Sequence, residues 1–246
     1  MTTSPDNGSA AARFVTTHSI LTLDARHPFV LKSLHDAQDM HRTVMSGFLG
    51  WVEDGQPEAR KLMGVLSTWS LNLRESTLII VVQANVPADW SRIPSNAMKD
   101  KPHTITVDKT IRTGNTYTFR TVVNPTRDRN TPKSIAEPGT RTRKRTPHQT
   151  PKWAESWFTD RLQPPGEPPI APSGTRRIGA TTDPNTLTVR MLPTVSSSGA
   201  HPGLRIIRAE LKGTLTVTDP KTFVEALHTG IGRARAYSAG LLLIRD

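Results

Sequence analysis

The chain has 246 residues, a formal net charge of +11 and no cysteine. The lack of cysteine excludes disulfides, thiolate metal sites and a cysteine nucleophile, and no apolar run approaches the ~20 residues that span a bilayer. The polar N-terminus lacks a secretory signal pattern, so we expect a cytoplasmic protein with a disordered tail over residues 1–11. The excess of Lys and Arg favours a nucleic-acid partner over a membrane, the alternative being a basic protein that binds neither.

The first half of the chain predicts four strands and two helices. Residues 13–23 are rich in β-branched residues and predict a strand. A helix is predicted over 34–48, because an apolar stripe recurs there at three- and four-residue spacing, at Ala37, Met40, Val44 and Phe48. Short apolar or alternating runs predict further strands, at 69–73, 78–83 and 103–109. Before the last of these, Asp89 predicts the N-cap of a short second helix.

The second half repeats this order of elements. Strands are predicted at 116–123, 186–191, 204–218 and 241–244, with Gly213 as the candidate for a β-bulge. Helices are predicted at 153–162, with Trp153 and Trp157 on one side, and from Asp219 through Pro220 to about residue 228. Two consecutive β-α-β-β-α-β units predict an α+β fold of tandem ferredoxin-like (RRM-like) domains with antiparallel sheets, over residues 12–111 and 114–246.

Three stretches predict irregular structure: 126–151, the proline-rich 163–174, and 196–203 as a hairpin tip. The first contains a basic run with Arg143, Lys144 and Arg145. This run is either a track for an RNA backbone or a solvated, disordered loop. On the strand before it, Tyr117 and Phe119 alternate, which suits either base stacking or packing in the core.

The closing segment GIGRARAYSAG is a candidate anion site. Gly230, Gly232 and Gly240 let a backbone approach a phosphate closely, and successive N–H groups can then form a cradle. Arg233 and Arg235 add bidentate phosphate contacts. The alternative is a glycine helix cap followed by a tight turn into the last strand.

His41 is a candidate for proton transfer. It lies beside the apolar stripe of the first predicted helix, so we expect it to be partly buried. Its charge changes near neutral pH, as a general acid or base requires. The alternative is a histidine packed in the core. No His/Asp/Glu cluster has the spacing of metal ligands, so we expect no metal.

Five motifs, in chain order, resemble one protein family. They are DMHRTVMSGF, PADWS, YTFRTVVNPTR, RTPHQTPKWAESWFTDRL and LKGTLTVTDPKTFVEALHTGIGRARAYSAGLLLI. Together they cover nearly the whole chain and resemble the CasE family, the CRISPR RNA-processing endoribonucleases of type I-E systems. The resemblance implies a metal-independent enzyme that binds the CRISPR repeat stem-loop and cuts at its 3′ side. The RNA's own 2′-hydroxyl would attack the phosphate and leave a 2′,3′-cyclic phosphate.

The same resemblance implies an enzyme without a cofactor. It would stay on its product, the crRNA stem-loop, as a subunit of the type I-E Cascade complex beside the other subunits. His41 stands at the family's catalytic histidine. The 230–240 loop, with Arg235 where the family usually has a lysine, would hold the RNA. Arg190 lies on a strand pair that resembles the family's inserted hairpin.

Two positions depart from the family pattern. Gln38 stands one helical turn before His41, where the family often has a tyrosine; an amide can orient a phosphate but cannot act as a phenolic acid. Ser46 stands where a relative has a lysine, and Arg42 is the nearby residue that would compensate. These departures keep two rivals open: a non-catalytic subunit that binds an RNA hairpin, and a basic scaffold that binds RNA without preference.

Overall fold

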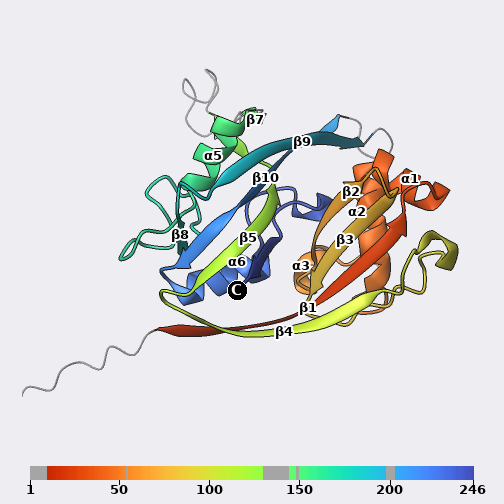
Figure 1. The fold of residues 1–246 in the computed structure, drawn as a ribbon, viewed down its shortest axis with the longest axis horizontal. Coiled ribbons are helices and arrows are strands. Elements are labelled where there is room, and N and C mark those ends of the chain that lie inside the picture. Colours follow the sequence, from red (N-terminus) through yellow and green to blue (C-terminus); the bar gives the residue numbers. More distant parts are fainter. Residues whose placement is uncertain (1–9, 54, 130–143, 148–149, 198–202) are drawn as a thin grey trace, which may run out of the picture.

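The computed structural model describes residues 10–53, 55–129, 144–147, 150–197 and 203–246, with the backbone alone at 127–129 and 144–147. Figure 1 shows two β-sheets side by side, each with helices packed on it. Two long strands of the first sheet, β1 (Ala11–Asp24) and β4 (His103–Arg112), run on past the second sheet.

The first sheet has four strands in the order β2-β3-β1-β4, with β2 over Leu66–Asn72 and β3 over Thr77–Ala84. Alternation along β1 and β3 puts apolar residues on one face, where Leu21 pairs with Ile80 and Leu23 with Leu78. The helices α1 (Pro28–His35), α2 (Ala37–Met45), η1 (Ser46–Phe48) and α3 (Ala59–Leu62) follow β1 in the chain. The predicted apolar stripe of α2 and η1 is buried against this face.

The second sheet has five strands in the order β11-β5-β10-β8, and β9 also pairs with β10. Their bounds are β5 (Thr116–Val123), β8 (Ala180–Thr182), β9 (Thr188–Ser197), β10 (Leu204–Val217) and β11 (Leu242–Arg245). The helices α5 (Pro151–Thr159) and α6 (Pro220–Thr229) contribute Trp157, Phe158 and Phe223 to its core. As predicted, Asp219 caps α6, whose first residue is Pro220.

Both sheets share one strand order. The last strand lies beside the first, followed by the third and the second, with every neighbouring pair antiparallel. This is the order that a β-α-β-β-α-β unit produces when both helices pack on one face. The predicted α+β fold with two antiparallel ferredoxin-like sheets is therefore confirmed.

The predicted helix over 34–48 is wrong in its extent. It is two helices, because Asp36 adopts extended backbone (φ −129°, ψ 124°) and ends α1. The Asp36 carboxylate then accepts a hydrogen bond of 2.7 Å from the backbone N–H of Gln38 and caps α2. A capping residue inside an apolar period was the signal that the stripe concealed.

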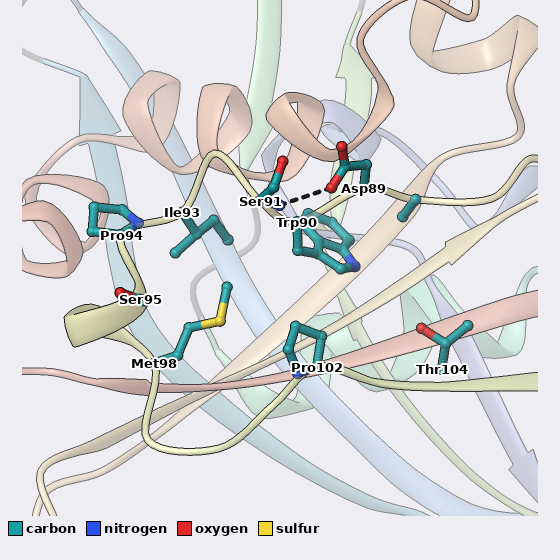
Figure 2. Close-up of a pocket in the computed structure, with 10 residues that line it drawn as sticks. Asp89, Trp90, Ser91, Ile93, Pro94, Ser95, Met98, Pro102 and Thr104 are labelled. Atoms are coloured by element: carbon teal, nitrogen blue, oxygen red, sulfur yellow. Dashed lines mark hydrogen bonds between the residues drawn. The ribbon is translucent and has the colours of Figure 1, made fainter.

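The short helix predicted after Asp89 is also wrong. Asp89 does accept the N–H of Ser91, at 2.9 Å, but this closes a turn, and the only helical residues that follow form a 3₁₀-helix, η2 (Ser95–Ala97). Figure 2 shows this segment folded around an open hollow of about 570 Å³, with the Trp90 ring on its wall. Trp90 packs against Phe48, so the segment supports the end of the α2–η1 region.

Three smaller predictions in the second half are corrected. The bulge in β10 lies between Ile206 and Arg208, not at Gly213, which is paired in register with Phe119. Trp153 is 48% exposed and does not share the burial of Trp157. The stretch 126–151 is not wholly irregular, because β6 (Thr126–Arg129) pairs with β7 (Lys144–Pro147).

The second core takes residues from both halves of the chain. Phe14 of β1 and Ile111 of β4 are buried in it, and the Phe14 ring lies edge-on to His228 of α6, 4.8 Å between centroids. The two predicted stacking residues, Tyr117 and Phe119, also belong to this core, stacked on Phe223 and Phe158. Their interpretation as base-stacking residues is therefore wrong.

Candidate functional site

His41 and the 230–240 segment meet in the fold. His41 lies on α2, partly buried, with its ring edge-on to Tyr237 at 6.1 Å between centroids and 62° between planes. It also forms a hydrogen bond with the backbone of Ala236. Both contacts are with η3 (Arg235–Tyr237), a 3₁₀ turn inside the glycine-rich segment. The two candidate sites at opposite ends of the chain thus form one site.

The surroundings of His41 favour a neutral imidazole. Burial lowers its pKa below the usual 6.5, the hydrogen bond to the Ala236 backbone opposes this, and the positive charges of Arg60 and Arg42 lower it further. At neutral pH the ring therefore carries one N–H, which the Ala236 carbonyl accepts, and one free lone pair. Such a ring is set up to receive a proton.

Arg60 was missed by the sequence analysis. It lies on the short helix α3, where its Nη1 donates to the Val65 carbonyl at 2.6 Å. Burial and the charge of Arg235 lower its pKa, with Glu58 opposing them. A four-residue helix leaves no periodic signal, so only the tertiary fold brings this charge to His41.

The glycines of the segment are needed for its own folding. The C-cap of α6 is Gly230, with φ +74°. The Ile231 N–H donates to the Gly240 carbonyl at 2.8 Å, and a Cβ on Gly240 would lie 2.5 Å from the Ile231 carbonyl oxygen. A Cβ on Gly232 would lie 2.7 Å from the Trp157 ring. The helix-cap and tight-turn interpretation accounts for all three glycines, and an RNA-binding role for them stays a prediction.

Five arginines line a hollow of about 220 Å³ beside this segment: Arg161, Arg176, Arg177, Arg233 and Arg235. Arg235 donates to the carbonyls of Gly232 and Thr229, at 2.9 and 2.8 Å, which satisfies carbonyls at the end of α6. The first three of the five were not singled out from the sequence. We call this group the arginine hollow.

Two arginines of the hollow are held by the protein in different ways. Arg161 stacks on the Trp157 ring, 3.5 Å from its centroid, and donates to the Trp157 carbonyl. At the rim, Arg176 pairs with Glu225 at 3.1 Å, where both side chains are more than half exposed. The hollow therefore gathers more positive charge than the neighbouring carboxylates offset.

Arg190 lies away from His41 in the hydrogen-bonding of the second sheet. It sits on β9 opposite Glu210 of β10, and its Nη2 donates to that carboxylate at 3.0 Å. Glu210 also binds Arg120 at 2.7 Å and Lys212 at 3.3 Å. Burial opposes ionisation of Glu210, but these cations outweigh it and hold its pKa below the usual range. We call this group the Glu210 cluster.

A buried arginine adjoins the Glu210 cluster. Arg208 is 1% exposed, lies 3.8 Å above the Trp69 ring of β2, and leaves Nε and Nη2 without a hydrogen-bond partner. Burial lowers its pKa to about 10, helped by the charge of Arg120 and opposed by Glu210. This contact joins the second sheet to the first.

The β9–β10 hairpin is tied to the helix that carries His41. The Ser197 hydroxyl donates to the Asp36 carboxylate at 3.0 Å, and Asp36 caps α2. In Figure 1, β9 crosses from the second sheet to α1 and α2. The hairpin and the candidate catalytic helix therefore share one carboxylate.

The remaining predicted residues divide as follows. Gln38 lies in the first turn of α2, and Arg42 pairs with Asp39 at 2.9 Å in the same helix as His41. Lys144 and Arg145 lie on β7, with their side chains outside the described residues, and Arg143 lies outside them altogether. The structure therefore does not test the basic run.

Where the chain is described, no helix has the length and apolar character to cross a bilayer. In the same part of the chain, no three His, Asp or Glu side chains gather where a metal ion could bind.

A family model described as CRISPR associated protein matches residues 18–246. The chain belongs to this family. That membership confirms the family indicated by the sequence motifs. No curated protein matches the sequence.

Solved structures share the fold of this CRISPR-associated protein. A structure of Thermus thermophilus Cse3 bound to an RNA representing a pre-cleavage complex matches with a TM-score of 0.69 and 19% identity, covering 95% of this chain and 100% of that one. Cas6e from Escherichia coli K-12 matches with a TM-score of 0.60 and 16% identity, over 93% and 98%. A chain of a CRISPR RNA-guided surveillance complex matches at 0.57 and 15%, over 93% and 98%.

Proposed function

We propose that this protein is a metal-independent endoribonuclease that binds the stem-loop of a CRISPR repeat, cuts at its 3′ side, and remains on the crRNA. The contact between His41 and the 230–240 segment carries the proposal, because it joins a proton-transfer group to a positively charged, phosphate-sized site. Family membership supports the proposal, as does the likeness to Cse3 bound to RNA.

The chemistry follows from the site. The RNA's 2′-oxygen forms a bond to the adjacent phosphorus and loses its proton, the bond from phosphorus to the 5′-oxygen breaks, and that oxygen gains a proton. His41, neutral with a free lone pair, accepts the 2′ proton. Arg60 and Arg42 add positive charge beside the reacting phosphate. The products are a 2′,3′-cyclic phosphate and a 5′-hydroxyl.

Several residues hold the RNA in this proposal. They are Arg42, Arg143, Lys144, Arg145, Arg190, Arg233 and Arg235, with Gly230, Gly232 and Gly240 in the loop and Gln38 orienting the phosphate. The protein acts in the cytoplasm with the other Cascade subunits as partners, and a chain of a surveillance complex shares its fold. No cofactor is needed, because every proton and charge in the step comes from side chains.

The test is cleavage of the host's repeat RNA in EDTA, with analysis of both new ends. A single cut that leaves a cyclic phosphate is expected. His41→Ala should slow it by about 10²–10⁴-fold and leave RNA affinity unchanged, because it removes the proton acceptor alone. His35→Ala, an exposed histidine on α1, is the matched control and should cut normally.

The second candidate is a non-catalytic subunit that binds the same RNA hairpin. One observation favours it: Gln38 puts an amide, and no phenol, in the first turn of α2. Binding of the repeat without any cut, unchanged by His41→Ala, would establish this function and exclude the nuclease. Equal affinity for a hairpin and a random strand would instead indicate a scaffold.

A further inference from the structure

We propose that Tyr237 is a second catalytic residue, the phenol that gives its proton to the departing 5′-oxygen. This inference rests on the proposed function, because it assigns a role within the same cleavage step. It begins from the balance of protons. The 2′-oxygen loses one proton and the 5′-oxygen gains one, so the site needs an acceptor and a donor.

His41 is placed to be the acceptor only. Its N–H is directed to the Ala236 backbone, and burial keeps the other nitrogen deprotonated at neutral pH. A separate group must therefore supply the proton to the leaving oxygen. Arg42 and Arg60 face His41 from α2 and α3, but a guanidinium does not give up its proton at any pH at which the protein works.

Tyr237 is the proton-bearing side chain that meets His41 from the third direction, η3. The two rings lie edge to face, with 6.1 Å between centroids. The Tyr237 hydroxyl makes no hydrogen bond with any residue that the structure describes, and it is not among the polar atoms sealed away from solvent. It is therefore open to a partner that is not part of the protein.

The backbone around Tyr237 is fixed in an uncommon shape. Ala234 and Ser238 both have positive φ, +61° and +58°, which side chains other than glycine rarely adopt. Two hydrogen bonds hold this shape: the Tyr237 N–H donates to the Ala234 carbonyl at 2.8 Å, and the buried hydroxyls of Ser67 and Ser238 lie 2.9 Å apart. Such enforced backbone is typical of sites where a side chain must be placed accurately.

The chain offers a matched comparison. Its other tyrosine, Tyr117, is buried in the second core, and its hydroxyl donates to the Asn115 amide oxygen at 3.2 Å. One tyrosine is thus satisfied within the protein, and the other keeps its hydroxyl for a ligand. The phenol that is absent from position 38 is in this way provided from the opposite end of the chain.

The experiment uses two repeat RNAs that differ in one atom. One has the natural 5′-oxygen at the scissile phosphate and the other has a bridging 5′-sulfur, which leaves as a thiolate without needing a proton. Tyr237→Phe should slow single-turnover cleavage of the oxygen RNA by about 10²–10³-fold. It should bind that RNA as tightly as the wild type and cut the sulfur RNA at the wild-type rate. His41→Ala should be slow on both, and Tyr117→Phe normal on both.

Two results would overturn the assignment of Tyr237 and leave the nuclease proposal intact. One is a Tyr237→Phe protein that cuts the oxygen RNA at the wild-type rate. The other is equal slowing on both RNAs, which would mean that the hydroxyl only positions the site. A wild-type protein that cuts neither RNA would refute the nuclease function itself, and the proposal for Tyr237 with it.

Discussion

The arginine hollow and the Glu210 cluster both gather cations on the second half of the chain, but they hold them differently. In the Glu210 cluster, one carboxylate with a 4% exposed side chain binds Arg120, Arg190 and Lys212. In the hollow, Arg235 is fixed by the carbonyls of Thr229 and Gly232. A carbonyl orients a guanidinium without cancelling its charge, whereas a carboxylate cancels it.

The difference indicates separate tasks. The Glu210 cluster joins β5, β9 and β10 and neutralises most of its own charge, so it stabilises the base of the hairpin. The arginine hollow keeps its field and faces the segment that contacts His41. Counting basic residues along the sequence treats both groups alike; the partner of each cation separates them.

The largest expected effect is on stability, from Glu210→Gln. This change leaves buried Arg208 beside Arg120 with no opposing charge, and we expect the free energy of unfolding to fall by about 3 kcal/mol. Urea denaturation measures it. The control is Glu225→Gln at the exposed rim of the hollow, which should change stability by less than about 0.5 kcal/mol. Equal effects would show that the two regions hold their cations alike.

The next effect is on RNA affinity. Arg235→Gln should weaken binding of the repeat hairpin about tenfold and reduce the slope of log affinity against log salt by about one. Arg190→Gln should cost less, because Glu210 already offsets that charge. Arg235→Lys, which keeps the charge but not the planar fork, should recover part of the loss. Titrations at several salt concentrations test this, and a larger loss from Arg190→Gln would reverse the assignment.

The smallest effect separates the regions by pH. The pKa of His41 is lowered below 6.5, so its neutral, active form persists to mildly acidic pH, and the cleavage rate should fall only as pH drops below 6.5 through that pKa. The pKa of Glu210 is also lowered, from 4.5, so its stabilising contribution is complete above 4.5 and is lost as pH falls through the folded value. Activity should therefore be lost at a higher pH than folding. Coincident loss of rate and of circular dichroism would contradict this order.

Local patterns predicted most of the secondary structure. β-branched runs gave the strands of both sheets, and Asp219 with Pro220 marked the start of α6. The failures are also physical. Asp36 breaks an apolar stripe whose period continues through it, and Asp89 closes a turn with the same side-chain bond that would cap a helix.

The site was predictable only in part. His41 and the glycine-rich segment stood out by residue type, but the contact between them is made by the fold. Arg60 and Tyr237 were not found, because each is an ordinary residue until a neighbour from elsewhere in the chain defines its role. Buried Arg208 was equally hidden, since its Trp69 partner lies on a different sheet.

The long strands β1 and β4 decide whether the two halves are independent modules. Their ends bring Phe14 and Ile111 into the second core, so each half alone would expose apolar surface that only the other covers. The repeated strand order suggests two interchangeable units, yet neither is a free-standing fold. The molecule should therefore unfold in one cooperative transition, and exchanging a half between relatives requires exchanging this strand ribbon with the core that receives it.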